Sequence, residues 1–116
     1  MQRDKIYNCP VDATLSVIGG KYKAIILHHL IERTLRFGEL QRLVPQASHK
    51  VLTQQLRELE RDGIIHRKVY HVVPLKTEYS LTDFGKTLIP ILTTICDWGR
   101  KHMSEFIRNT KDDIES

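Results

Sequence analysis

The clearest pattern of hydrophobic and polar positions lies between Ser48 and Gly63. Leu52, Leu56 and Leu59 follow one another at intervals of four and three residues, which places them on one face of a helix. Ser48 is a favourable N-cap residue, and Gly63 is typical of a helix end. The remaining faces carry charged or hydrogen-bonding side chains, namely His49, Lys50, Thr53, Gln54, Arg57 and Arg61. The pattern predicts a helix of about 15 residues whose leucine face packs inward.

Shorter segments precede this helix. Cys9-Pro10 has the form of an N-cap followed by proline at the first helical position, and it begins a helix that Gly19-Gly20 ends. Residues 21–32 repeat apolar positions at helical spacing, which predicts a second helix. An extended link over residues 35–37 leads into a short helix over residues 38–43, which a proline then stops.

Strand character replaces the helical period in the next part of the chain. Residues 64–70 and 76–82 are rich in side chains that favour strands, and the residues between them include a proline. We therefore expect a β-hairpin with a longer tip over residues 64–82.

The last apolar segment has more hydrophobic positions than one helix face can hold. We expect a helix from Phe84 to beyond Ile107, kinked rather than ended by Pro90 because the helical period continues on both sides. Its apolar positions form two adjacent stripes, which is more apolar surface than one small domain covers and indicates a partner chain. The residues expected at that interface are Leu88, Leu92, Ile95, Cys96, Trp98, Met103 and Phe106.

Composition indicates one ordinary globular domain spanning residues 1–116. The chain has 116 residues, of which 41% are hydrophobic and 28% are charged, so it can form a core without disulfides or metals. No apolar run approaches the roughly 20 residues of a membrane span, and no signal-type segment begins the chain. We therefore expect a cytoplasmic protein without a membrane partner.

The sequence offers no catalytic or metal-binding motif. Its two cysteines form neither a disulfide framework nor a paired zinc motif. The adjacent His28 and His29 would point about 100° apart on a helix, and no HxxxH or HExxH pair occurs. Nucleophile motifs and phosphate-binding glycine loops are also missing. We expect no metal, no cofactor and no enzymatic activity.

Positive charge is concentrated in the middle of the chain. Residues 33–76 hold nine basic and four acidic residues, a net charge of +5, whereas the whole chain carries +4. A basic centre is typical of a surface that meets a polyanion, although a solvated face with a chance imbalance gives the same count.

The order of the predicted elements is that of a winged helix-turn-helix, a mainly α fold with a small β-hairpin (α+β). Residues 38–62 would form the helix-turn-helix and residues 64–82 the wing. The helix that begins at Ser48 would place its N-terminal end in a major groove. The residues expected to contact DNA are Ser48, His49, Lys50, Thr53, Gln54, Arg57, Arg67, Lys68, His71 and Lys76. The alternatives are a solvated helix and hairpin, or a winged helix that binds an acidic protein.

Four motifs, in order, resemble the HxlR-type winged helix-turn-helix regulators of bacteria, which are related in fold to MarR regulators. They are Cys9-Pro10-Val11 with Ile18-Gly19-Gly20-Lys21, then residues 35–40, 52–64 and 78–85. The resemblance covers about residues 7–103. It implies a homodimeric transcription factor, which we expect to be a repressor, paired through residues 8–20 and 83–110 and bound to a pseudo-palindromic operator in double-stranded DNA. Tyr22 departs from the family's usual tryptophan, and Gln46-Ala47 from its frequent Gly-Ile pair.

Cys9 is the candidate sensor of oxidants or electrophiles. At a helix N-cap its sulfur would face unpaired N–H groups, which favour a reactive thiolate. The resemblance agrees, since several HxlR-type regulators sense with a cysteine at this position, by thiol modification or an intersubunit disulfide. One alternative is an inert Cys9, with control by a small molecule bound near Trp98 and Phe106. Cys96 is expected to be a small apolar interface residue, and a bridge between Cys9 and Cys96 of two chains stays open.

Overall fold

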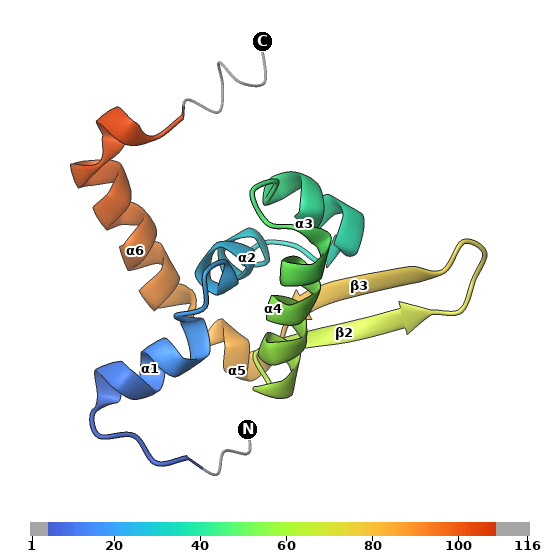
Figure 1. The fold of residues 1–116 in the computed structure, drawn as a ribbon, viewed down its shortest axis with the longest axis horizontal. Coiled ribbons are helices and arrows are strands. Elements are labelled where there is room, and N and C mark those ends of the chain that lie inside the picture. Colours follow the sequence, from blue (N-terminus) through green and yellow to red (C-terminus); the bar gives the residue numbers. More distant parts are fainter. Residues whose placement is uncertain (1–4, 109–116) are drawn as a thin grey trace.

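The computed structural model describes residues 5–108 and confirms the winged helix-turn-helix fold (Figure 1). The helices are α1 (Pro10–Ile18), α2 (Lys23–His29), α3 (Phe37–Leu43), α4 (His49–Arg61), α5 (Asp83–Lys86) and α6 (Ile89–His102), followed by the 3-10 turn η1 (Ser104–Phe106). The strands are β1 (Leu35–Arg36), β2 (Ile65–Tyr70) and β3 (Lys76–Leu81). Residues 109 and 110 of the expected C-terminal pairing segment lie outside the described residues.

The three strands form one antiparallel sheet with β3 in the centre, in the order β1-β3-β2. The expected hairpin is present, with Ile65 opposite Leu81 and Tyr70 opposite Lys76. The link before α3 is more than a connection, because Leu35 lies opposite Tyr79 and makes β1 a third strand. This pairing attaches the start of the helix-turn-helix directly to the base of the wing.

The hydrophobic core forms around the leucine face of α4. Leu52, Leu56 and Leu59 are almost completely buried, as the pattern predicted. They belong to one cluster with residues of α2, α3, β1 and the start of β2, among them Ile26, Leu27, Leu35, Leu40, Val44, Ile64 and Ile65. Burying one such side chain stabilises the fold by about 1.5–3 kcal/mol, so this face holds α4 firmly to the rest of the domain.

Both ends of α4 follow the expected capping chemistry. The Ser48 hydroxyl oxygen accepts a hydrogen bond from the Val51 N–H at 3.1 Å. At the other end Gly63 adopts a φ of +75°, a left-handed conformation that suits glycine, and the Ile64 N–H donates to the Leu59 carbonyl oxygen at 3.0 Å. The chain can therefore turn from α4 into the wing without losing backbone hydrogen bonds.

The C-terminal segment corrects the expectation of a single kinked helix. It consists of two helices, α5 and α6, and α6 ends at His102. Pro90 lies in the first turn of α6, where its missing N–H interrupts no helical hydrogen bond. The break at residues 87–88 was hidden because a tight turn, in which the Leu88 N–H donates to the Gly85 carbonyl at 3.0 Å, preserves the apolar spacing.

The second helix is also shorter than the expected span of residues 21–32. It ends at His29 because the Leu30 N–H donates to the Leu27 carbonyl at 3.0 Å, a tightened last turn. Leu30 itself is buried, so the apolar pattern continues beyond the helix that it suggested.

The junction between the wing and α5 depends on a glycine. The Thr82 hydroxyl oxygen accepts from the Gly85 N–H at 2.9 Å, and the Thr82 N–H donates to the Ile64 carbonyl at 3.1 Å. A Cβ atom at position 85 would collide with that Ile64 carbonyl oxygen, which is backbone and cannot move aside.

We expect Gly85→Ala to lower the free energy of unfolding by about 1–3 kcal/mol, since a methyl group must be forced into closed space. Gly38→Ala is the matched control, because a Cβ there meets no atom within 4 Å and alanine favours a helix. Urea denaturation followed by circular dichroism measures both variants. Equal stabilities for the two variants would contradict the described packing of α5.

Candidate nucleic-acid interface

The N-terminal half of α4 presents polar side chains away from the core. Ser48, His49, Lys50 and Gln54 are exposed, and Arg57 is exposed one turn further on. The first turn of a helix has unpaired N–H groups and the positive end of the helix dipole, so this end of α4 suits contact with an anionic surface.

Thr53 differs from its neighbours on this helix. It is half-buried, and its hydroxyl donates a hydrogen bond to the His49 carbonyl oxygen at 2.8 Å. Its hydrogen is therefore engaged within the helix, and its oxygen is left to accept a hydrogen bond from a ligand. Of the polar residues predicted on α4, Thr53 is the one least free to read a base.

The His49 ring is positioned by an aromatic contact that the sequence did not reveal. It lies against Phe37, with ring centroids 4.7 Å apart and a tilt of 53°. Phe37 begins α3, so this contact joins the first turns of the two helices of the helix-turn-helix. The restricted ring can present a nitrogen at the N-terminal end of α4.

A second group of contacts holds α4 against the start of α2. The Gln55 side-chain oxygen accepts from the Tyr22 N–H at 3.3 Å. Lys23, whose side chain is only 7% exposed, forms an ion pair with Glu58 at 3.5 Å. These residues were not predicted from the sequence. Gln55 and Glu58 lie three positions apart, on one side of the helix beside the leucine face, and this spacing could have indicated a shared contact.

Tyr22 also organises the turn between α3 and α4. Its hydroxyl donates to the Gln46 carbonyl oxygen at 3.1 Å, while the Gln41 side-chain amide donates to the Ala47 carbonyl at 2.8 Å. Tyrosine at this position therefore contributes a hydrogen bond as well as buried ring surface. The orientation of α4 is therefore determined by its contacts with α2, with the turn that precedes it and with the start of α3.

The side chains of the wing that are expected to contact DNA differ in exposure. Arg67, Lys68 and His71 are exposed, whereas Lys76 is half-buried and lies 3.7 Å from the Glu78 carboxylate. The ammonium groups of Lys68 and Lys76 lie 4.8 and 4.7 Å from the centre of the same ring, that of Tyr70. The charge of the wing is thus concentrated along its strands.

Glu78 lowers the net charge midway along the wing, opposite Lys68. A hydrogen bond with the Tyr70 side chain holds the pKa of the Glu78 carboxyl below its ordinary value, and the nearby charges of Lys76 and Arg36 act in the same direction. An ionised Glu78 partly offsets Lys76, its ion-pair partner, whereas Arg67 and Lys68 are exposed cations of β2.

Cys9 lies at the N-cap of α1, as expected from the Cys9-Pro10 pair. The residue is exposed, and its sulfur accepts a hydrogen bond from the Asp12 N–H at 3.4 Å. The thiol is therefore accessible to small reagents and lies beside the unpaired N–H groups of a helix start.

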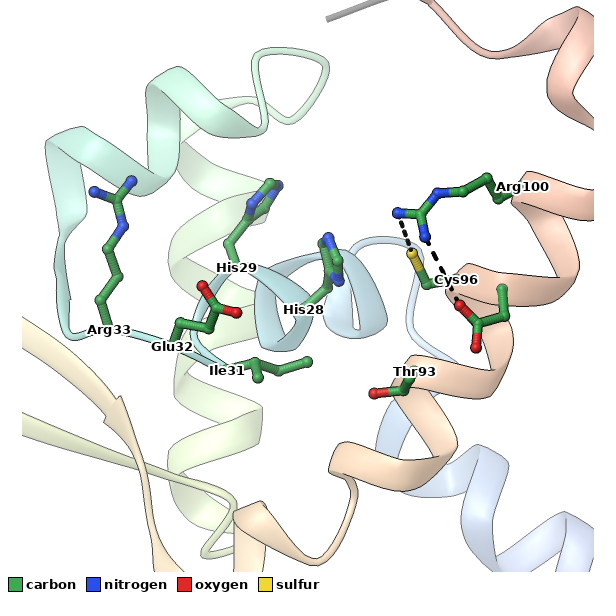
Figure 2. A pocket seen from close by; sticks show the side chains of 9 residues that line it. His28, His29, Ile31, Glu32, Arg33, Thr93, Cys96 and Arg100 are labelled. Atoms are coloured by element: carbon green, nitrogen blue, oxygen red, sulfur yellow. Dashed lines mark hydrogen bonds and ion pairs between the residues drawn. The ribbon is translucent and has the colours of Figure 1, made fainter.

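Cys96 lies elsewhere, on the side of α6 that faces α2 (Figure 2). It is half-buried, and its sulfur accepts a hydrogen bond from the Arg100 guanidinium at 3.3 Å, while Arg100 also lies 3.7 Å from Asp97. It lines a cavity of about 380 Å³ together with His28, His29, Ile31, Glu32, Arg33, Thr93, Asp97 and Arg100. Burial, and then the charges of His28 and Arg33, lower the pKa of His29, which favours the neutral imidazole.

The residues expected at a partner interface divide into two groups. Leu92 is 3% exposed and packs in the core of its own chain, and Leu88 is half-buried against that core. Ile95, Trp98, Met103 and Phe106 are exposed, with Trp98 at 59% and Phe106 at 77%. Val11 and Leu15 of α1, which lie in the expected pairing segment of residues 8–20, are also exposed and add a second apolar set.

Within residues 5–108, no group of three or more histidine, cysteine, aspartate or glutamate side chains is placed to hold a metal ion. No helix in the same range combines the length and the apolar character needed to cross a bilayer.

Comparison with known proteins identifies the family. The family model for the HxlR-like helix-turn-helix matches residues 17–106. The HTH-type transcriptional regulator YdeP of Bacillus subtilis (strain 168) is 54% identical over 99 residues, which cover 85% of this chain and 77% of YdeP.

Solved structures agree with this result. The redox regulator HypR in its oxidized form superposes with a TM-score of 0.78 and is 54% identical, covering 81% of this chain and 97% of that chain. A MarR-family transcriptional regulator from Porphyromonas gingivalis W83 superposes with a TM-score of 0.80 at 34% identity, covering 87% and 99%. These proteins are regulators rather than enzymes. The chain therefore belongs to the HxlR-like helix-turn-helix family of DNA-binding transcriptional regulators.

Proposed function

We propose that this regulator is a homodimeric repressor that binds a pseudo-palindromic operator in double-stranded DNA. The observation that carries the proposal is the setting of α4, whose leucine face is buried while its N-terminal end exposes His49, Lys50 and Gln54. A helix held in this way can enter a major groove with its polar end first.

The exposed residues have different tasks in this proposal. The Gln54 amide can form hydrogen bonds with the edge of an adenine. The shorter side chains of Ser48, His49 and Thr53 would make polar contacts with the DNA nearby. Lys50 and Arg57 meet guanine or phosphate. The wing contributes Arg67, Lys68 and Lys76, whose charges neutralise phosphates, and His71, which contacts the DNA backbone or minor groove. The base contacts would give specificity, and the phosphate contacts would give most of the salt-dependent affinity.

The second subunit would cover the apolar faces of α1 and α6. Trp98 and Phe106 are exposed, and Ile95 and Met103 extend the same apolar surface. Monomeric proteins rarely expose an apolar surface of this kind, so we expect a second subunit to cover it. A two-fold dimer would place two α4 helices about 34 Å apart, in successive major grooves. Occupancy of the operator would then block transcription.

Cys9 would make the repressor responsive to oxidants. It is exposed at a helix N-terminus, and HypR, at 54% identity, is described as a redox regulator. A hydroperoxide would convert the Cys9 thiolate to a sulfenic acid and leave as the alcohol, and the sulfenic acid could then condense with the Cys9 thiol of the second subunit and release water. The change at the start of α1 would alter the dimer and hence the spacing of the α4 helices.

Binding to DNA from the protein's own upstream region tests the division of tasks on the DNA face. Gln54→Ala should weaken operator binding about 5- to 100-fold and flatten the preference for operator over random duplex, because a base contact is lost. Lys68→Ala should weaken all sequences alike and reduce the slope of log K against log salt by about 0.9 per lost phosphate contact.

Lys101→Ala provides the matched control, since it removes an exposed lysine at the end of α6, away from the hairpin (Figure 1). It should leave the salt slope unchanged. A binding constant that is insensitive to salt, or equal effects of Gln54→Ala and Lys68→Ala on specificity, would overturn the proposed contacts.

The dimer is tested by Ile95→Glu combined with Trp98→Glu, which introduces charge into the exposed apolar face of α6. Sedimentation equilibrium should give the mass of a dimer for the wild type and of a monomer for the variant, since unpaired charges cannot be buried at an interface cheaply. Val73→Ser, an exposed apolar residue on the wing, should remain dimeric. A monomeric wild type would refute the paired arrangement.

The sensor is tested by treating the DNA-bound protein with cumene hydroperoxide. The wild type should release the operator and regain it after reduction, whereas Cys9→Ser should stay bound, because it lacks the reacting thiol. Cys96→Ser is the control and should respond as the wild type does. A response that survives in Cys9→Ser would reject Cys9 as the sensor and leave Cys96 as the reacting thiol, whereas a wild type that keeps the operator under oxidation would favour control by a ligand.

A further inference from the structure

The tip of the wing is unusually apolar for a hairpin loop. Residues 72–75 read Val-Val-Pro-Leu, whereas hairpin loops commonly carry glycine, asparagine, aspartate or serine. Val73 is fully exposed, Leu75 is 67% exposed and Val72 is 55% exposed. These side chains therefore form an apolar projection for which the domain itself provides no cover.

The tip also stands away from the body of the domain. A hollow of about 450 Å³ lies between it and Arg36, Phe37 and Gly38 at the start of α3. Figure 1 shows the hairpin projecting beyond α3 and α4, with the tip at its far end. The apolar loop is thus positioned to meet something outside the chain.

The charges around the tip indicate the kind of partner. The ammonium groups of Lys68 on β2 and Lys76 on β3 lie over the Tyr70 ring, next to the loop. Arg67 lies on β2, one residue further from the loop than Lys68. This arrangement is complementary to a DNA groove. The apolar loop matches the less polar walls and stacked bases of the groove, and the cations beside the loop match the phosphates that flank it.

The length of the wing selects the minor groove. The six residues of β2 span about 20 Å, and half a turn of B-DNA, which separates a major groove from the next minor groove, is about 17 Å. With α4 in a major groove, the tip would reach the neighbouring minor groove while the lysines behind it stay near the phosphates.

We propose that residues 72–75 form an apolar wedge that enters the minor groove beside each half-site, partly unstacks one base step and bends the operator. Proline and leucine are among the residues that other minor-groove proteins insert in this way. This inference rests on the proposed DNA binding by α4. It adds specificity for flexible pyrimidine–purine steps at a place where no hydrogen bond reads the bases.

The test uses the full-length protein and operator duplexes in which one adenine of the flanking sequence is replaced by 2-aminopurine, moved step by step. This base fluoresces more strongly when it is unstacked. The wild type should raise the fluorescence at one step on each side of the operator and should bend a duplex labelled for energy transfer at its ends.

The variant is Val73→Ser combined with Leu75→Ser, two exposed positions whose change should leave thermal unfolding unaltered. It should lose the fluorescence signal and the bend, and bind on the order of tenfold more weakly. Its salt slope should equal that of the wild type, because no phosphate contact is lost. Lys68→Ala is the contrast, with a reduced slope and a retained fluorescence signal.

The wedge is overturned if the double variant binds and bends the operator as the wild type does, an outcome that would leave α4 as the reader and the tip free for a protein partner. A wild type that binds no duplex overturns both the wedge and the proposed function. Whether the wild-type protein binds duplex DNA therefore distinguishes a failure of the wedge from a failure of the proposed function.

Discussion

Burial of the leucine face of α4 is the interaction on which the rest of the structure depends. Leu52, Leu56 and Leu59 bring α2, α3, β1 and the start of β2 into one core. Because these side chains are spaced at helical intervals, their burial also determines which residues point outward, and so exposes Lys50 and Gln54. The same packing that stabilises the domain thereby orients the side that we propose to contact DNA.

Polar contacts refine what the leucines establish. Gln55 and Glu58 bind the start of α2, and Tyr22 reaches across to the turn before α4. Through these residues the start of α2, which follows α1 after a short turn, is joined to the helix expected to read DNA. The proposed sensor at Cys9 lies at the other end of α1, so the two sites are linked by one short helix and its packed neighbours.

The described surface separates three kinds of chemistry. Cationic and polar side chains lie on α4 and the wing, large apolar ones on α1 and α6, and both cysteines lie outside the proposed DNA face. The tip of the wing is the exception, since its apolar residues project from a charged element. This distribution is consistent with a regulator that pairs through one side and binds DNA through another.

The sequence by itself determined the local features: the leucine-backed helix with its Ser48 cap, the hairpin, the Cys9 cap and the family motifs. These features depend on neighbours within a few residues, so they can be predicted from the periodicity and the turn-forming residues of the sequence. Tertiary structure alone decided the break before α6, the pairing of β1, the buried Lys23–Glu58 ion pair and the burial of Leu92 in its own core. An apolar pattern states that a side chain will be covered, but the packed arrangement of distant segments determines what covers it.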